Sequence, residues 1–119
     1  MIKAIRGAVK IDADTPEAIR SGVVILLNTL LEENRLRERN IVSLVFSQTG
    51  DLRSENPAAA LRTRGFEEVP LFCCREPDIE GMMTRVIRVL VTVRVFRFRP
   101  LTPVYVNGAE SLRPDLPGN

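Results

Sequence analysis

The sequence predicts an α+β (mixed α/β) fold in which the helices pack on one face of a sheet. A long helical pattern with a broad apolar stripe follows the first apolar run of the chain. The other apolar runs are short, rich in β-branched residues and bounded by turn residues, as strands are. A chain of 119 residues can bury one core of this kind, so we expect residues 1–119 to form a single domain.

The first half of the chain is predicted to form a strand, a long helix and a second strand. Residues 2–11, "IKAIRGAVKI", give the first strand. The helix lies within residues 14–36, because Thr15 can supply an N-cap and Pro16 suits the first helical position. The second strand covers residues 40–49, "NIVSLVFSQT".

The second half is predicted to contain a short helix followed mostly by strands. The helix spans residues 56–65, with Asn56 as its cap, Pro57 at its first position and Gly65 as its end. Strands are expected at residues 67–73, 84–95 and 104–106, before a tail that ends in a Pro-rich turn.

Helices on one side leave the other face of an apolar sheet uncovered. A contiguous apolar patch of that size normally marks an interface. We therefore expect self-association into a cyclic oligomer, with pockets between the subunits.

The composition excludes several kinds of site. The chain has no histidine, so Ser-His-Asp triads, Cys-His pairs and imidazole metal sites are excluded. Cys73 and Cys74 are adjacent, a spacing that matches neither a zinc site nor a CxxC redox pair, and reduced thiols are the natural interpretation. We found neither a signal-peptide pattern nor an apolar run near the ~18 residues that a membrane-spanning helix needs. A soluble, cytoplasmic protein with no membrane partner is expected.

Arginine dominates the basic residues, and Arg88 is the most informative of them. Only Lys3 and Lys10 are lysines among 17 basic residues. Arginine suits bidentate recognition of carboxylate or phosphate, although a GC-rich genome gives the same bias. Arg88 lies inside "RVIRVLVTV", residues 85–93, where an unpaired buried charge would cost several kcal/mol. It should therefore face a partner or a ligand.

A few other side chains could build a site with Arg88. Arg6 lies beside a glycine, Glu76 follows the strand "VPLFCC", and Tyr105 is the single tyrosine. Each also has a purely structural interpretation: an edge arginine, a solvated turn glutamate or a half-buried ring. Together they suit a small polyanion that carries a hydroxyl, bound between subunits, and catalysis by fixed charge and orientation.

Five segments, in this order, resemble the AroH-class chorismate mutases over almost the whole chain. They are "IRGA" (5–8), "DTPEAI" (14–19), "VPLFCCRE" (69–76), "VIRVL" (86–90) and "VY…LRPDL" (104–116). The resemblance implies a pseudo-α/β-barrel homotrimer with three pockets between subunits and no cofactor. It also implies an isomerase that converts chorismate to prephenate by a one-step Claisen rearrangement, in the biosynthesis of phenylalanine and tyrosine.

The same resemblance assigns roles to residues. Arg88 would donate to the ether oxygen as its bond breaks. Glu76 and Cys73 would hydrogen-bond the ring hydroxyl of the substrate. Arg6 and Tyr105 would hold a carboxylate.

Four more residues complete the predicted substrate-binding set. Arg62 would reach in from the neighbouring subunit, and Arg113 in the tail would help to close the pocket. Leu112 and Asn56 would line it, with Asn56 at a position that is usually aromatic in this family. No metal ligand is predicted.

Two rival interpretations remain open from the sequence. A trimer of the reactive-intermediate deaminase family has a similar architecture and acts on imines or enamines. A non-catalytic anion or nucleic-acid binder is suggested by "RVFRFRP" (94–100), which alternates basic and aromatic residues. The near-neutral net charge of +2 argues against nucleic acid as the partner.

Overall fold

The computed structural model describes residues 1–113 of the chain. The predicted Pro-rich turn and the end of the "LRPDL" segment lie outside the described residues. The helices are α1 (Pro16–Glu33) and α2 (Pro57–Arg62), with short 3-10 helices at Glu38–Asn40 and Glu110–Leu112. The strands are β1 (Ile2–Lys10), β2 (Ile41–Gln48), β3 (Leu71–Arg75), β4 (Val86–Arg94) and β5 (Val104–Val106).

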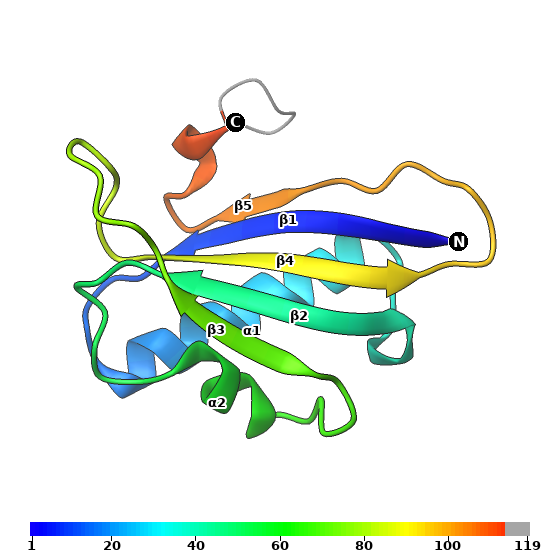
Figure 1. Cartoon of the computed structure of the whole chain (residues 1–119), viewed down its shortest axis with the longest axis horizontal. Coiled ribbons are helices and arrows are strands. Elements are labelled where there is room, and N and C mark those ends of the chain that lie inside the picture. The colour runs from blue at the N-terminus through cyan, green and yellow to red at the C-terminus, as the bar shows by residue number, and fades with distance from the viewer. Residues whose placement is uncertain (114–119) are drawn as a thin grey trace.

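The five strands form one mixed sheet in the order β3-β2-β4-β1-β5 (Figure 1). The central strand β4 runs antiparallel to both of its neighbours, β1 and β2. The edge strands β3 and β5 run parallel to β2 and β1 respectively. Residues from both halves of the chain are thereby brought side by side on the sheet.

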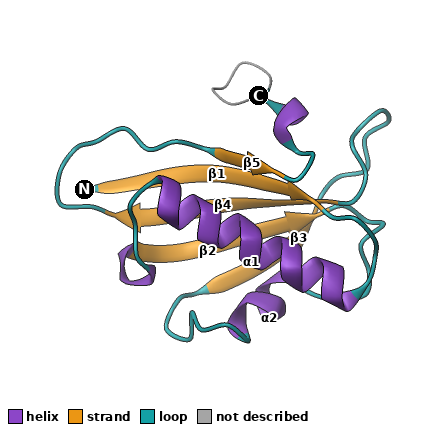
Figure 2. Cartoon of the chain, turned by 180° about the vertical axis from the view of Figure 1, so that it is seen from behind, coloured by secondary structure: helices purple, strands orange, loops and turns teal. Residues whose placement is uncertain are grey.

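Both helices lie on one face of the sheet, as Figure 2 shows from behind, and the main core fills the space between. The buried stripe of α1 recurs every three or four residues, which places it on the sheet side of the helix. The helix starts as predicted, because Thr15 Oγ1 accepts the backbone N–H of Ala18 at 3.1 Å and Pro16 follows the cap. The predicted fold class is confirmed.

Gly7 in β1 allows the chain to pack closely around it. A Cβ atom at this position would lie 3.1 Å from Leu26 Cδ1 in α1 and 3.1 Å from the backbone oxygen of Val104 in β5. A further contact at 3.2 Å would come from Val89. The missing side chain beside Arg6 therefore admits the helix and the edge strand.

The prediction of a strand over residues 67–73 is wrong in its bounds, because β3 begins only at Leu71. The chain turns first: Phe66 has a positive φ of 59°, and its carbonyl accepts the N–H of Val69. The strand then continues through Cys73 and Cys74. The two cysteines are thus consecutive strand residues and point to opposite faces of the sheet.

The face opposite the helices is apolar and uncovered, as expected. A row of register partners crosses it from Phe72 through Val45 and Leu90 to Arg6. The three apolar side chains of this row are all exposed. Figure 1 is viewed from this side of the sheet.

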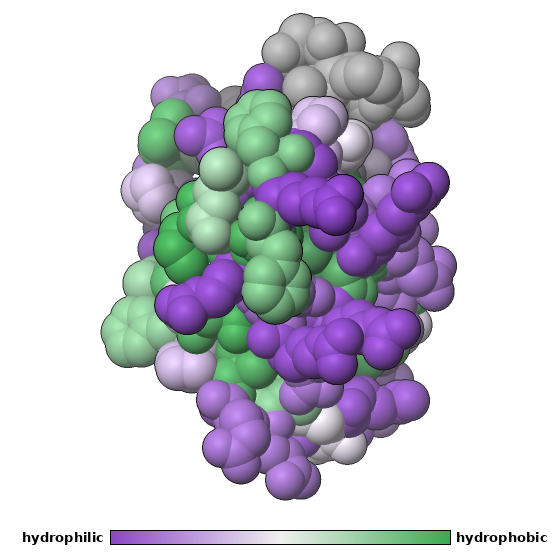
Figure 3. Space-filling view, turned by 90° about the vertical axis from the view of Figure 1, so that its right-hand side faces the viewer, coloured by the Kyte–Doolittle hydropathy of each residue, from purple (hydrophilic) through white to green (hydrophobic). Residues whose placement is uncertain are grey.

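The loop that connects β4 to β5 carries aromatic and basic residues at one end of the molecule. Phe96 and Phe98 are both exposed, and Lys3 Nζ lies 4.4 Å from the centroid of the Phe98 ring. Figure 3 shows this end, where apolar and hydrophilic residues alternate over the surface. No helix within residues 1–113 is both long enough and apolar enough to cross a membrane.

Candidate active site

A pocket of about 420 Å³ opens on the uncovered face of the sheet. Its lining includes three arginines and the single tyrosine, which come from positions between 6 and 113 of the chain. The polar side chains that line it are those of Arg6, Ser47, Arg88, Tyr105 and Arg113, with the thiol of Cys74.

The register of the sheet explains why these residues meet. Cys74, Ser47, Arg88, Ala8 and Tyr105 are successive partners on β3, β2, β4, β1 and β5. They form one row that crosses the whole sheet, and cross-strand partners point to the same face. Ala8 itself is fully buried, and the four larger side chains of this row line the pocket.

Arg88 has the partner that its position required. Its Nε lies 3.0 Å from Oε1 of Glu76, and the two side chains are 37% and 12% exposed. Glu76 follows β3 directly, and its backbone N–H donates to the carbonyl of Gln48 at 2.8 Å. The closest contact of the ion pair joins Arg88 Nε to Glu76 Oε1, and the Arg88 side chain also lines the pocket. The carboxylate of Glu76 therefore balances the charge of Arg88, which still lines the pocket.

Ser47 is a residue of this site that sequence reasoning missed. Its Oγ donates to Glu76 Oε1 at 2.6 Å. The same oxygen therefore accepts the Ser47 hydrogen bond and forms the ion pair with Arg88. In the strand segment "VFSQ", Ser47 points to the face of the sheet opposite to that of the buried Phe46. This alternation was the only sequence pattern that could have placed Ser47 on the site's face. A serine between apolar strand residues is too common to have singled it out.

Arg6 and Tyr105 reach the pocket from β1 and β5. The Arg6 guanidinium makes no bond to another residue of the described chain, so its donors are free for an anion. Tyr105 is half-buried against a small cluster that also packs Ala8 and Leu112. Leu112 thus packs against the same cluster as the tyrosine, and Arg113, the next residue, lines the pocket itself.

Five predicted site residues do not line this pocket: Glu76 and Leu112, described above, and also Cys73, Asn56 and Arg62. Cys73 packs against the core on the helix side, where burial first and the adjacent Cys74 second raise the pKa of its thiol. Asn56 caps α2 by accepting the N–H of Ala58 at 2.8 Å. Both residues line a second pocket of about 320 Å³. Cys74 lines both this pocket and the first one.

Arg62 is the last of these residues. Its Nη1 donates to the backbone carbonyls of Phe66 and Glu67, just beyond the end of α2. In the single chain this guanidinium therefore holds the turn that leads into β3. It points to neither of the two pockets.

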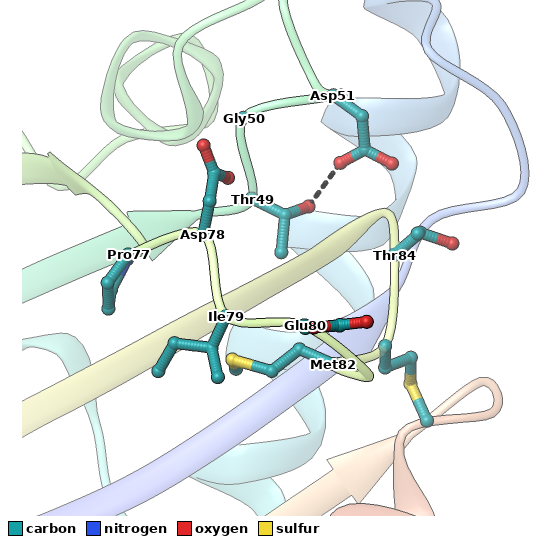
Figure 4. A pocket seen from close by; sticks show the side chains of 10 residues that line it. Thr49, Gly50, Asp51, Pro77, Asp78, Ile79, Glu80, Met82 and Thr84 are labelled. Atoms are coloured by element: carbon teal, nitrogen blue, oxygen red, sulfur yellow. Dashed lines mark hydrogen bonds between the residues drawn. The ribbon is translucent and has the colours of Figure 1, made fainter.

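A third pocket, of about 320 Å³, lies beside the 77–84 loop and is shown in Figure 4. It is lined by the carboxylates of Asp51, Asp78 and Glu80, which would repel an anionic ligand. Asp51 already accepts the hydroxyl of Thr49 at 2.6 Å, the bond drawn in Figure 4, together with the backbone N–H of Arg85. This pocket is acidic, whereas the pocket on the uncovered face is the one suited to an anion.

Fold and site together define a class: a small α+β protein with an arginine-lined anion pocket on the open face of its sheet. A sequence profile of the family chorismate mutase type I matches residues 2–116. The chain therefore belongs to the chorismate mutase type I family.

Individual proteins agree with this assignment. Two relatives named chorismate mutase AroH cover 98% of the chain. The Thermus thermophilus protein is 39% identical and matched over 97% of its length, and the Bacillus subtilis protein is 36% identical and matched over 93%. A solved chorismate mutase from Clostridium thermocellum superimposes with a TM-score of 0.87 at 34% identity, covering 92% of this chain and 98% of that one. The predicted activity, an isomerase of the chorismate mutase type, is confirmed over the deaminase and the non-catalytic binder.

Proposed function

We propose that the rearrangement of chorismate to prephenate takes place in the pocket lined by Arg6, Arg88 and Tyr105. The observation that carries this proposal is the pairing of Arg88 with Glu76 on a face where two other arginines are also present. A dicarboxylate with a ring hydroxyl matches this set of groups. The arginines suit the carboxylates, and the carboxylate of Glu76 suits the hydroxyl.

The reaction itself needs no proton transfer and no covalent intermediate. The ether C–O bond of the substrate breaks while a C–C bond forms within the same molecule, so every atom is retained. Negative charge collects on the ether oxygen as its bond lengthens. A preplaced donor at that oxygen stabilises the transition state more than the neutral ether of the ground state, which is the condition for catalysis.

Arg88 is the donor proposed for that role. Its Nε lies 3.0 Å from Glu76 Oε1, and this ion pair would restrain the guanidinium. On this proposal, the terminal nitrogens face the pocket without having to reorganise during the reaction. Fixed donors of this kind are the main source of electrostatic catalysis.

The remaining groups would bind and orient the substrate. Arg6 and Tyr105 hold a carboxylate, and Arg113 closes the pocket from the tail side. The second oxygen of Glu76 accepts the ring hydroxyl. Binding at both ends holds the flexible substrate in the compact conformation from which the new C–C bond can form.

We further propose a homotrimer in which a neighbouring subunit completes each pocket. The uncovered apolar row on the same face supports this, because such a surface is normally an interface. The division of the predicted residues between two pockets supports it as well, since Cys73 and Asn56 line the second one. On this proposal the second pocket of one subunit, together with Arg62, lies against the first pocket of the next.

A direct assay tests the activity and the assembly together. Purified protein treated with a chelator is added to chorismate, and the appearance of prephenate is followed while light scattering gives the mass in solution. We expect turnover that chelation does not change, and three times the chain mass of 13.3 kDa. Prephenate formation at the uncatalysed rate would overturn the assignment of this pocket, and a stable monomer would overturn the shared site.

Free thiols at Cys73 and Cys74 also support the proposal that the protein works in the cytoplasm.

A further inference from the structure

The ion pair between Arg88 and Glu76 has a third member. Ser47 Oγ donates to Glu76 Oε1 at 2.6 Å, and Arg88 Nε lies 3.0 Å from the same oxygen. Hydrogen bonds to an ionised acceptor are shorter and about twice as strong as neutral ones, so this contact is a strong constraint on the carboxylate. One oxygen of Glu76 thus accepts a hydrogen bond from one strand and is ion-paired to the guanidinium of another.

The backbone around the carboxylate adds to the constraint. The N–H of Glu76 donates to the carbonyl of Gln48, the residue that follows Ser47 on β2. Ser47 is also the direct cross-strand partner of Arg88. Consecutive residues of β2 therefore hold Glu76 by its main chain and by its side chain.

The other oxygen, Glu76 Oε2, makes no hydrogen bond to another described residue. With Oε1 occupied twice, Oε2 is the acceptor left for a substrate group. If the hydroxyl of Ser47 were absent, the carboxylate could turn about its terminal bond, because torsions of this kind are broad and two-fold. The two oxygens could then exchange places, and Arg88 would lose its fixed contact.

We propose that Ser47 is a positioning residue of the mutase site, which assigns Oε1 of Glu76 to Arg88 and Oε2 to the ring hydroxyl of the substrate. This inference rests on the pocket proposed above. Ser47 does not touch the reacting atoms in this scheme. It acts through Glu76, and through Glu76 on the orientation of Arg88.

Three substitutions test the proposal by steady-state kinetics. Ser47→Ala should lower kcat about 10-fold, the loss expected for one hydrogen bond to a charged group, and should change KM less than about threefold. Ser47→Thr should recover most of kcat, because it restores a hydroxyl. Ser43→Ala is the matched control, since Ser43 lies on the same strand, is half-buried like Ser47 and has no side-chain hydrogen bond within residues 1–113. It should leave kcat unchanged.

A double-mutant cycle shows whether Ser47 acts through Glu76. In a Glu76→Ala background, adding Ser47→Ala should change kcat by less than about twofold, because the acceptor is already gone. Equal losses in both backgrounds, with thermal unfolding unchanged, would overturn the positioning role, as would a Ser47→Ala variant with full kcat. If Glu76→Ala alone keeps full turnover, the proposed pocket fails instead. The two failures are therefore distinguishable.

Discussion

Arg88 and Tyr105 lie on either side of Ala8, on the two strands that neighbour β1. Ala8 is fully buried, and its methyl group packs with Val86 and Ala109. One small residue therefore separates two side chains that line the pocket. On the proposed mechanism, strand register places the donor for the reacting oxygen one intervening strand away from the phenol that binds a carboxylate.

Ala8→Val should disturb Tyr105 more than the rest of the fold. Added methyl groups in a packed cluster cost about 1–3 kcal/mol and push neighbours aside. We expect a lower temperature of unfolding and a higher KM, measured by calorimetry and by initial rates. A variant with unchanged KM would show that the space around Ala8 does not position the tyrosine.

Arg6→Ala should weaken substrate binding more clearly than turnover. The Arg6 guanidinium is free in the described chain and lies in the pocket, so its loss removes a carboxylate contact that ground state and transition state share. KM should rise at least about 10-fold, as for loss of a charged hydrogen bond. Arg64→Ala is the matched control, because Arg64 is an exposed arginine just past α2. Equal KM values for the two variants would remove Arg6 from the site.

The two cysteines should differ in reactivity. Cys74 is exposed and faces the pocket, whereas Cys73 packs on the core, and burial together with the neighbouring Cys74 raises the pKa of its thiol. Only the thiolate reacts with an alkylating agent, so the raised pKa and the burial of Cys73 should both slow its reaction. Mass spectrometry after iodoacetamide treatment should find Cys74 modified first, and prephenate should slow that modification. Faster labelling of Cys73 would contradict the placement of the two side chains.

Asp14 should make stability depend on acid pH. The backbone N–H of Arg53 and then the hydroxyl of Ser54 lower the pKa of this carboxyl below its usual 3.8, by hydrogen bonds of 2.9 and 2.8 Å. A carboxyl whose pKa is lower in the folded state stabilises the fold above its unfolded value and loses that contribution as the pH falls through the folded one. Asp14→Asn should therefore unfold at a lower temperature than wild type at pH 7, with the gap closing below about pH 4. Asp12→Asn, at an exposed neighbour, is the control; an equal effect of both variants would contradict the specific role of Asp14.

The sequence predicted the parts of the site that depend on local pattern. The parity of the 85–93 segment placed Arg88 on the face opposite the apolar valines, and the cost of an unpaired charge required a partner. Capping residues placed the start of both helices correctly. These features are local, because they depend on the residue type and on a fixed period.

Features that depend on strand bounds and on distant pairing were not predictable in the same way. The turn at Phe66 delays β3, and parity then turns Cys74 toward the arginine pocket and Cys73 toward the core. The capping role of Asn56 was expected, yet it also places the residue at a second pocket. The role of Ser47 emerges only from the pairing of β2 with β4.

The central claim is that Arg88 meets developing charge on the ether oxygen, and Arg88→Gln tests it most directly. Steady-state kinetics on a folded variant, checked by circular dichroism, should show kcat lowered at least ~10²- to 10³-fold, the usual loss for one preorganised donor. KM should change far less, because the ground-state ether carries little charge. A folded Arg88→Gln protein with wild-type kcat would contradict this mechanism, and so would a variant that fails to fold, since Arg88 would then be a structural residue.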